Sequence, residues 1–283
     1  MIDKQTRKWI CKVTGSTTLS FHPVSGGCIN NTFLATSETD SKFFIKANSQ
    51  TPHDFFKAEA EGLKLLSRTN ALRIPKVIDC NNNAICLEYI DSSAKDQSYW
   101  RKLAQGLLAI HNTTSDKFGL ATNNYCGSTP QLNSQMENGY YFFAENRIKY
   151  QVKMGVDNKL LSKDDVVAID KVLNRIEDIV PYQSASLLHG DLWGGNIFTD
   201  EKGMPVLIDP AVYYGWPETD LAMTKLFGGF SPEFYNAYFE AAKLEQGFED
   251  RVDIYNLYHL LNHLNLFGTV YLGQVRTAYR KYL

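Results

Sequence analysis

The sequence predicts an α+β fold, with strands gathered in roughly the first ninety residues and helices in the remainder. Short apolar runs that alternate as strands do, separated by turns rich in Gly and Asn, fill most of the first part. From Tyr99 onward, apolar residues recur at the spacing of buried helix faces. With 283 residues, the chain can bury a large core as one domain or as two lobes.

Composition argues against several classes of function. Hydrophobic residues make up 44% and charged residues 21% of the chain, as in ordinary soluble globular proteins. The net charge of -2 gives no basic field to attract nucleic acid or an anionic membrane. No stretch has the character of a signal peptide or a membrane span, so a cytoplasmic protein is expected. The five cysteines lack the spacing of a zinc site, and reduced thiols are expected.

The first part begins with a predicted short helix at residues 2–14 and strands at 19–24, 33–36 and 42–47. A loop with the sequence SGGCINNT joins the first two strands. Because glycine lacks a Cβ, backbone N–H groups in such a loop can approach the phosphates of a nucleotide. A hairpin of this kind is more often only a hairpin, so its interpretation depends on its surroundings. The nucleotide-binding candidates here are Gly26, Gly27, Cys28 and Asn30.

Lys46, in the third predicted strand, supports the interpretation of this loop as a nucleotide-binding loop. Alternation along its strand points the side chain inward together with Phe44, and a buried lysine needs an anionic partner. A helix predicted at residues 54–69 offers Glu59, which falls within the apolar stripe, whereas Glu61 falls on the opposite side. A strand lysine paired with a helix glutamate after a glycine loop is the arrangement that positions ATP in kinases.

The remaining elements are mainly helical. Two more strands are expected at residues 74–80 and 84–90, and helices at 99–112, 136–154, 162–180, 232–243 and 248–266. Another helix begins near Asp220, whose charge complements the helix dipole. Residues 113–135 form a long irregular segment, and such a segment inside a compact domain is usually functional. His111 is interpreted as a satisfied structural histidine at a helix end.

The strongest functional signal is the segment LLHGDLWGGN at residues 187–196, followed by a hairpin and the sequence VLIDP. A turn at residues 201–203 joins strands IFTD and PVLID, which brings Asp209 back toward Asp191 and Asn196. Charged residues interrupt core-forming apolar sequence mainly where the chemistry of a site requires them. Phosphoryl transfer needs a carboxylate base, a role that suits Asp191. It also needs oxygen ligands for Mg²⁺, a role that suits Asn196 and Asp209.

This segment resembles the catalytic loop and metal-binding aspartate of the protein-kinase-like superfamily, in the HGD form found in aminoglycoside and choline phosphotransferases. Over most of its length the chain is similar to the fructosamine kinase (ketosamine 3-kinase) family. The shared motifs are GGCINNTF, the FFIK lysine, TPQLN, LLHGDLWGGN, IDPA, DLAM, LFGGF and LYHLLNHLNLFG. Several are loop motifs, so chance similarity of core patterns does not account for them.

The resemblance implies a two-lobed protein-kinase-like fold, with a sheet-rich N-lobe at residues 1–90 and a helical C-lobe at residues 91–283. It implies an ATP-dependent, Mg²⁺-using kinase that phosphorylates the 3-hydroxyl of ketosamines, whose unstable product then leaves the amine. It also places Asp220 behind the backbone of the catalytic loop. The hinge residues expected to meet the adenine edge are Glu88, Tyr89 and Ile90.

The acceptor site is less clearly defined. Aromatic rings suit the apolar faces of a sugar, and the candidates near Asp191 are Trp193, Tyr213, Tyr214 and Trp216. Core packing is almost as good an interpretation of Tyr213 and Tyr214. The family often has His or Gly where this chain has Trp216 and Pro217, so a different rim of the sugar pocket is expected.

Two other classes stay open. An aminoglycoside or choline kinase would share the catalytic residues but needs an acidic acceptor site for a cation, and a counter-screen with those acceptors distinguishes it. A pseudokinase would have lost a catalytic group, and none is lost here. The sequence leaves open whether ribulosamines or fructosamines are preferred and whether the acceptor is free or protein-bound. It also leaves open whether the chain is a monomer or a homodimer linked through Cys28, whose thiol could act as a redox switch.

Overall fold

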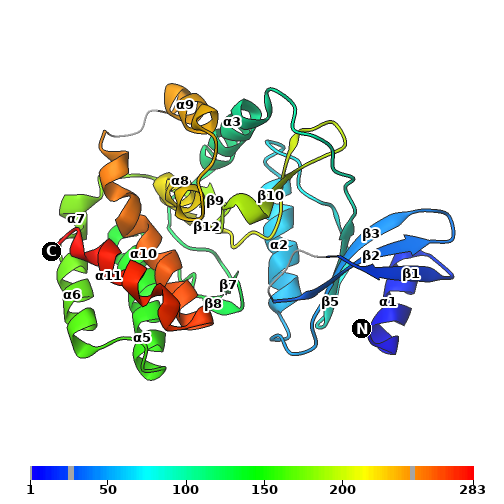
Figure 1. The fold of residues 1–283 in the computed structure, drawn as a ribbon, viewed down its shortest axis with the longest axis horizontal. Coiled ribbons are helices and arrows are strands. Elements are labelled where there is room, and N and C mark those ends of the chain that lie inside the picture. The colour runs from blue at the N-terminus through cyan, green and yellow to red at the C-terminus, as the bar shows by residue number, and fades with distance from the viewer. Residues whose placement is uncertain (1, 25–28, 243–245) are drawn as a thin grey trace.

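The structure is a computed structural model that describes residues 2–24, 29–242 and 246–283. Gly26, Gly27 and Cys28, at the centre of the predicted glycine loop, lie outside the described residues. Figure 1 shows the sheet at one end of the molecule and most of the helices at the other. The predicted α+β class, sheet-rich first and helical afterwards, is confirmed.

The N-terminal part is an antiparallel sheet of order β1-β2-β3-β5-β4 with α1 against one face and α2 against the other (Figure 1). Its strands are β1 (Leu19–Pro23), β2 (Asn31–Ser37), β3 (Lys42–Ala47), β4 (Val77–Cys80) and β5 (Ala84–Glu88). Its helices are α1 (Lys4–Thr14) and α2 (Phe55–Ser67). All of these elements were expected from the alternation and periodicity of the sequence.

Alternation along β3 decides which side chains reach the site. Ile45 packs in a small cluster on the α1 face, together with Ile10 and Cys86. Lys46 is paired in register with Ile85 and therefore points to the opposite face, where α2 lies. The sheet thus carries one charged side chain into an apolar layer beneath α2.

The C-terminal part is mainly helical. Its helices are α3 (Tyr99–His111), α4 (Gly139–Phe142), α5 (Tyr150–Asp157), α6 (Lys163–Leu173), α7 (Ile176–Ile179), α8 (Pro217–Leu226), α9 (Pro232–Ala241), α10 (Phe248–Phe267) and α11 (Leu272–Arg280). A π-helical segment, η1 (Phe143–Lys149), joins α4 to α5, and short 3-10 turns are η2 (Gly194–Asn196) and η3 (Thr269–Tyr271).

Short strands support the loops of this part. They are β6 (Thr114–Ser115), β7 (Asn124–Cys126), β8 (Thr129–Gln131), β9 (Ala185–Leu188), β10 (Ile197–Thr199), β11 (Pro205–Leu207) and β12 (Tyr213–Gly215). The segment 113–135 that was predicted to be irregular contains β6 and the β7–β8 hairpin. The YYG sequence forms strand β12, which pairs with β9.

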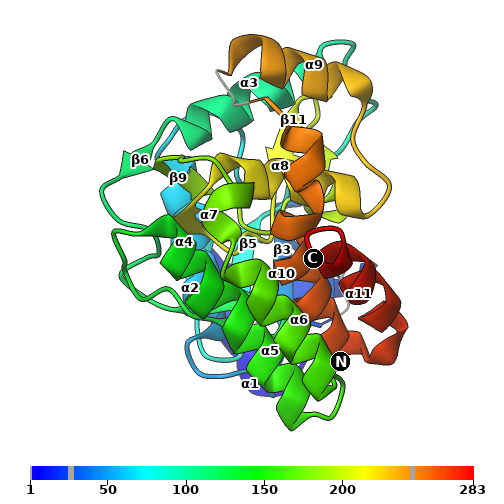
Figure 2. The same ribbon diagram turned by 90° about the vertical axis from the view of Figure 1, so that its left-hand side faces the viewer.

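Helix α10 is the central element of the C-terminal part. Its residues are buried on all sides, including Ile254, Leu257 and Leu261, as expected for a core helix. Figures 1 and 2 show it running between α5 and α11, and it contacts both. Among the described residues, no helix combines the length and apolarity that a membrane span requires.

Candidate active site

The catalytic loop leaves the buried strand β9 and is held from behind by Asp220 of α8. The carboxylate of Asp220 accepts the backbone N–H groups of His189 at 2.7 Å and Gly190 at 2.9 Å. Gly190 has a φ of 81°, and a Cβ there would lie 2.0 Å from the carbonyl oxygen of Ala211. Only glycine fits this turn. The predicted bracing role of Asp220 has the geometry it requires.

His111 completes this support. Its Nε2 lies 3.2 Å from Asp220 and its Nδ1 lies 2.6 Å from the hydroxyl of Tyr238. Both ring nitrogens therefore have partners in the core, which confirms the interpretation of His111 as a structural histidine. Burial alone would raise the pKa of Asp220, but hydrogen bonds from His111 and the loop backbone hold that pKa below its ordinary value.

Asn196 and Asp209 converge on Asp191 as predicted. The Nδ2 of Asn196 donates to the backbone carbonyl of Asp191 at 2.8 Å and to its carboxylate at 3.1 Å. The β10–β11 hairpin, with Ile197 opposite Leu207, returns the chain to Asp209. Asp209 has a φ of 54°, an uncommon conformation for a residue with a side chain. Because the amide nitrogen of Asn196 faces Asp191, its oxygen is the atom left to serve as a ligand.

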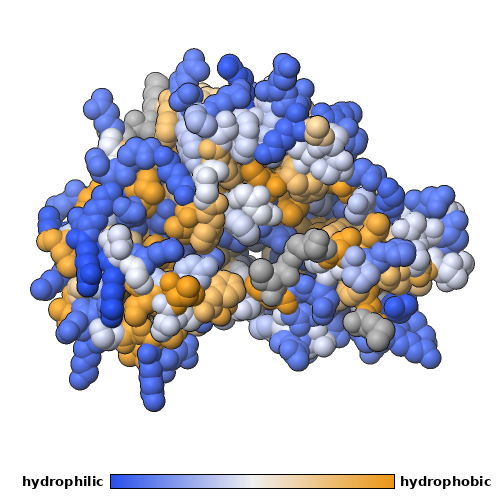
Figure 3. Space-filling view, viewed as in Figure 1, coloured by the Kyte–Doolittle hydropathy of each residue, from blue (hydrophilic) through white to orange (hydrophobic). Residues whose placement is uncertain are grey.

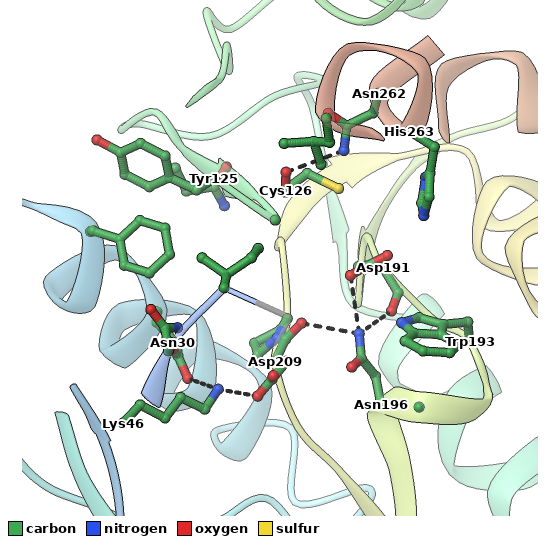
Figure 4. A pocket seen from close by; sticks show the side chains of 18 of the residues that line it. Asn30, Lys46, Tyr125, Cys126, Asp191, Trp193, Asn196, Asp209, Asn262 and His263 are labelled. Carbon is green, nitrogen blue, oxygen red and sulfur yellow. Dashed lines mark hydrogen bonds and ion pairs between the residues drawn. The ribbon is translucent and has the colours of Figure 1, made fainter. Parts of the chain in front are cut away.

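The predicted contact between Lys46 and Glu59 is confirmed. Lys46 is 5% exposed, and its Nζ lies 2.6 Å from the carboxylate of Glu59 and also pairs with Asp209 (Figure 4). Burial alone would lower the pKa of Lys46, but the negative charges of Asp209 and Glu59 hold that pKa above its ordinary value. Lys46 is therefore a fixed positive charge beside the metal-ligand candidates.

Asp191 differs from the other carboxylates of the site. Its burial raises its pKa to about 7; the hydrogen bond from Asn196 opposes this shift, whereas the charges of Asp209 and Asp220 add to it. Proton transfer is most efficient when the pKa of the catalytic group lies near the working pH. Asp191 therefore has both the position and the proton affinity of a general base.

These groups line one side of a cavity of about 620 Å³ between the two parts of the molecule. In the space-filling view (Figure 3) the surface is hollowed between the two parts, and apolar groups border the hollow. The predicted site residues that line the cavity are Asn30, Lys46, Glu59, Asp191, Trp193, Asn196 and Asp209. Figure 4 labels all of these residues except Glu59, with Trp193 beside Asp191 and Lys46 at the opposite end.

Two acceptor-site predictions, Tyr213 and Trp216, are wrong, and that for Tyr214 stays a prediction. Tyr213 and Trp216 are each 3% exposed and lie in the core, and Tyr214 packs against the same core without lining the cavity. Tyr213 covers the guanidinium of Arg147, whose Cζ lies 3.9 Å from the ring centroid, and the ring of Trp216 lies 5.3 Å from that of Phe143. Pairing of β12 with β9 turns this segment into the core, so Trp216 forms no part of a pocket rim.

The predicted contact of Glu88 with the adenine edge stays a prediction. The N–H of Glu88 donates to the carbonyl of Lys76 at 2.8 Å, and its carboxylate accepts from Arg73 at 2.9 Å. Glu88 therefore has a structural role in the sheet. Tyr89 and Ile90 do not line the cavity, and their contact with adenine stays a prediction.

Several cavity residues were not identified as site residues from the sequence. They are Asn124, Tyr125 and Cys126 of β7, Phe227 after α8, Asn262, His263, Leu266 and Phe267 of α10, and Tyr271 of η3. Two signals pointed toward them. The long segment 113–135 was predicted to be functional, and polar residues interrupt the apolar pattern of α10.

The fold and this geometry define a phosphotransferase of the protein-kinase-like class. An aminoglycoside phosphotransferase bound to gentamicin has the same fold, with a TM-score of 0.66 and 14% identity over 100% of this chain and 96% of the other. At this identity the likeness concerns the fold alone.

Sequence comparison identifies the family. The chain belongs to the fructosamine kinase family, whose model matches residues 2–283. It is 38% identical over 265 residues to a probable ketoamine kinase of Synechocystis sp., covering 92% of this chain and 89% of the relative. It is 35% identical over 298 residues to the chloroplastic protein-ribulosamine 3-kinase of Arabidopsis thaliana, covering 100% and 89%. A crystal structure of a Thermobifida fusca protein assigned as a fructosamine-3-kinase has a TM-score of 0.90 and 26% identity over 99% of both chains.

Proposed function

We propose that this protein transfers the γ-phosphoryl group of ATP to the 3-hydroxyl of a ketosamine, either free or attached to a protein. The names of the Arabidopsis and Thermobifida relatives support this substrate class. The single observation that carries the proposal within this chain is the character of the acceptor end of the cavity.

The described residues that line the cavity include three carboxylates, those of Glu59, Asp191 and Asp209, and all three belong to the catalytic arrangement. The acceptor end near Asp191 has no further carboxylate among the described lining residues, and Cys126, Trp193, Asn262 and His263 surround it (Figure 4). A polycationic aminoglycoside would need further negative charge there to offset its desolvation, whereas the assay with choline tests the choline alternative. A sugar adduct, with hydroxyl groups and apolar ring faces, fits this lining better.

The residues present also fit a nucleotide with Mg²⁺. The side-chain oxygen of Asn196 and the carboxylate of Asp209 are hard oxygen donors of the kind that Mg²⁺ prefers, and both lie beside Lys46 or Asp191. A bound Mg²⁺ would neutralise charge on the phosphate oxygens. Lys46, fixed by Glu59, orients the phosphates, and Asn30 borders the same space from the N-terminal part.

The transfer itself uses Asp191. The acceptor hydroxyl oxygen attacks the γ-phosphorus while the bond to the bridging oxygen of ADP breaks, and the hydroxyl proton passes to the carboxylate of Asp191. Asn196 holds that carboxylate in place through its Nδ2. A positioned base of this kind contributes about 10² to 10⁴ in rate.

Two further parts of the proposal concern organisation. We place the boundary between the lobes at residues 90 and 91, within the segment that separates β5, ending at Glu88, from α3, starting at Tyr99. Cys11, Cys80, Cys86 and Cys126 are free thiols, and free thiols together with ATP use support a cytoplasmic setting.

The test is an ATP-consumption assay over a panel of acceptors. The panel contains a ribulosamine and a fructosamine of lysine, a glycated protein, an aminoglycoside and choline. We expect turnover on the ketosamines, and a loss of about 10² to 10⁴ in kcat for Asp191→Asn with ATP binding retained. Asp116→Asn, an exposed aspartate outside the cavity, is the matched control. Preferred turnover of the aminoglycoside or choline would refute the substrate class, and near wild-type turnover by Asp191→Asn would refute the base.

A further inference from the structure

Three side chains from distant parts of the chain meet at the acceptor end of the cavity. They are Cys126 at the end of β7, Asp191 in the catalytic loop, and His259 in the middle of α10. One potential ligand atom of each lies within 4.8 Å of the others. Cys126 and Asp191 both line the cavity, and Figure 4 shows the sulfur of Cys126 pointing toward Asp191. The cluster is therefore reachable from the space where the acceptor binds.

His259 gives an independent reason to look for a ligand here. The residue is 3% exposed, and its buried Nδ1 has no hydrogen-bond partner among the described residues. A buried polar atom without a partner in a native fold calls for an ion or a water molecule to satisfy it.

We propose that Cys126, His259 and Asp191 form a binding site for a soft or borderline divalent cation of the Zn²⁺ type. Thiolate sulfur, imidazole nitrogen and carboxylate oxygen are the ligands that Zn²⁺ takes, and three protein ligands leave a fourth position open toward the cavity. The nucleotide-associated Mg²⁺ binds oxygen ligands only, so Asn196 and Asp209 serve the hard cation and this cluster serves the soft one.

The surroundings hold the ligands in place before any metal arrives. The Nδ2 of Asn262 donates to the backbone carbonyl of Cys126 at 3.2 Å, which ties β7 to α10. The hydroxyl of Tyr258, next to His259, donates to Gln131 of β8 at 2.8 Å. Supporting contacts of this kind reduce the ordering that metal binding requires.

Metal binding at this cluster blocks the proposed reaction. The thiol of Cys126 gives up its proton to solvent as the sulfur–metal bond forms, and any proton on the carboxylate of Asp191 leaves as well, so binding releases protons. The carboxylate of Asp191 then coordinates the metal and can no longer accept the proton of an acceptor hydroxyl. The cation is therefore an inhibitor that competes with the acceptor and is indifferent to ATP, a consequence that rests on the proposed function.

The first test measures binding directly and needs no activity. Co²⁺, used as a spectroscopic substitute for Zn²⁺, is titrated into the reduced protein, and thiolate-to-cobalt charge-transfer absorption is recorded. Zn²⁺ affinity is then measured by competition with a chromophoric chelator. All proteins carry Cys28→Ala, so that the thiol of the predicted glycine loop does not contribute. Cys126→Ser and His259→Gln remove one ligand each, and Cys11→Ser on α1 is the matched control.

We expect one equivalent of metal, with a thiolate absorption band that Cys126→Ser abolishes. Loss of either ligand should weaken Zn²⁺ binding by at least about tenfold, the minimum seen when even a supporting residue is lost, whereas Cys11→Ser should bind as the parent does. Because His259 is buried, thermal melting is used to check that His259→Gln is folded. Cys126→Ser is nearly isosteric, so it tests the site even if His259→Gln does not fold. Equal affinity in Cys126→Ser and Cys11→Ser, or no thiolate band, overturns the proposal. That outcome is expected if a water molecule, and not a metal ion, satisfies the Nδ1 of His259.

The second test measures turnover of a ketosamine with buffered free Zn²⁺ at saturating ATP and Mg²⁺. Inhibition should be reversed by chelator and by raised ketosamine concentration, and it should be weaker in Cys126→Ser. Inhibition that ATP relieves and the ketosamine does not would contradict competition at Asp191. If the protein binds Zn²⁺ through Cys126 but turns over no ketosamine, the proposed metal site is supported and the proposed substrate is refuted.

Discussion

Removal of the Asp220 carboxylate should both destabilise the fold and displace Asp191, the proposed catalytic base. Asp220 is 2% exposed, and it accepts the N–H groups of His189 and Gly190, which are the two residues before Asp191. In Asp220→Ala these two donors are left in the interior without acceptors. Each buried polar group without a partner costs about 1–3 kcal/mol, so the free energy of unfolding should fall by about 2–6 kcal/mol.

Asp220→Asn separates the two effects. The asparagine retains the shape and one accepting oxygen, but its NH₂ group must face either Gly190 or the pair formed by His189 and His111. We expect a smaller loss of stability, about 1–3 kcal/mol, because one donor still finds an acceptor. A displacement of the base by about 1 Å can cost on the order of 100-fold in rate, so kcat should fall while ATP affinity changes little.

Urea unfolding measures the stability of both variants, and initial rates at saturating ATP measure kcat. Asp116→Asn, which is exposed, serves as the control for the loss of one negative charge. The reasoning fails if Asp220→Asn unfolds within about 0.5 kcal/mol of wild type, the range of ordinary surface substitutions, and retains its kcat.

Three more predictions concern other residues. Lys46→Met and Glu59→Gln should damage the same ATP-dependent step, so a double-mutant cycle on kcat/KM should show a coupling of about 1–3 kcal/mol; additive losses would mean that the pair is unimportant. Hydrogen bonds from Arg276 hold the pKa of Asp165 well below its ordinary value. This stabilisation is complete above about pH 4 and is lost as pH falls, so wild type should lose more stability than Asp165→Asn between about pH 5 and 3, as urea unfolding at each pH will report. Wild type should form a reductant-sensitive dimer on non-reducing gels and Cys28→Ala should not; absence of the dimer, with equal response of both activities to reductant, would exclude the redox switch.

The sequence predicted best what depends on local periodicity. Alternation along β3 placed Lys46 on the inner face, and helical phase placed Glu59 toward it and Glu61 away. Their contact at 2.6 Å therefore needed no knowledge of the wider fold. The hairpin that returns Asp209 to Asp191 is likewise encoded in a short stretch with its own turn. These features are reliable because the residues that set them are neighbours in the chain.

Predictions failed where burial depends on pairing between distant strands. Tyr213 and Trp216 have the chemistry of sugar-binding rings, but pairing of β12 with β9 turns them into the core. The cluster of Cys126 and His259 is the opposite case, a candidate site that the sequence did not predict. Metal sites are recognised in sequence by short ligand spacings, and these ligands come from β7 and α10, which meet only in the folded protein.

The carboxylates of the site differ in their proposed roles because they have different partners. Asp220 is surrounded by donors from His111 and the loop backbone, which keep its pKa low. Asp209 pairs with the positive charge of Lys46, and its carboxylate is proposed as a ligand for a cation. Asp191 has only the amide of Asn196 to offset its burial and its two negative neighbours, which raise its pKa to about 7. Different environments that push the pKa values of neighbouring acids apart also favour different roles for them, and this difference supports the proposal that Asp191 is the base.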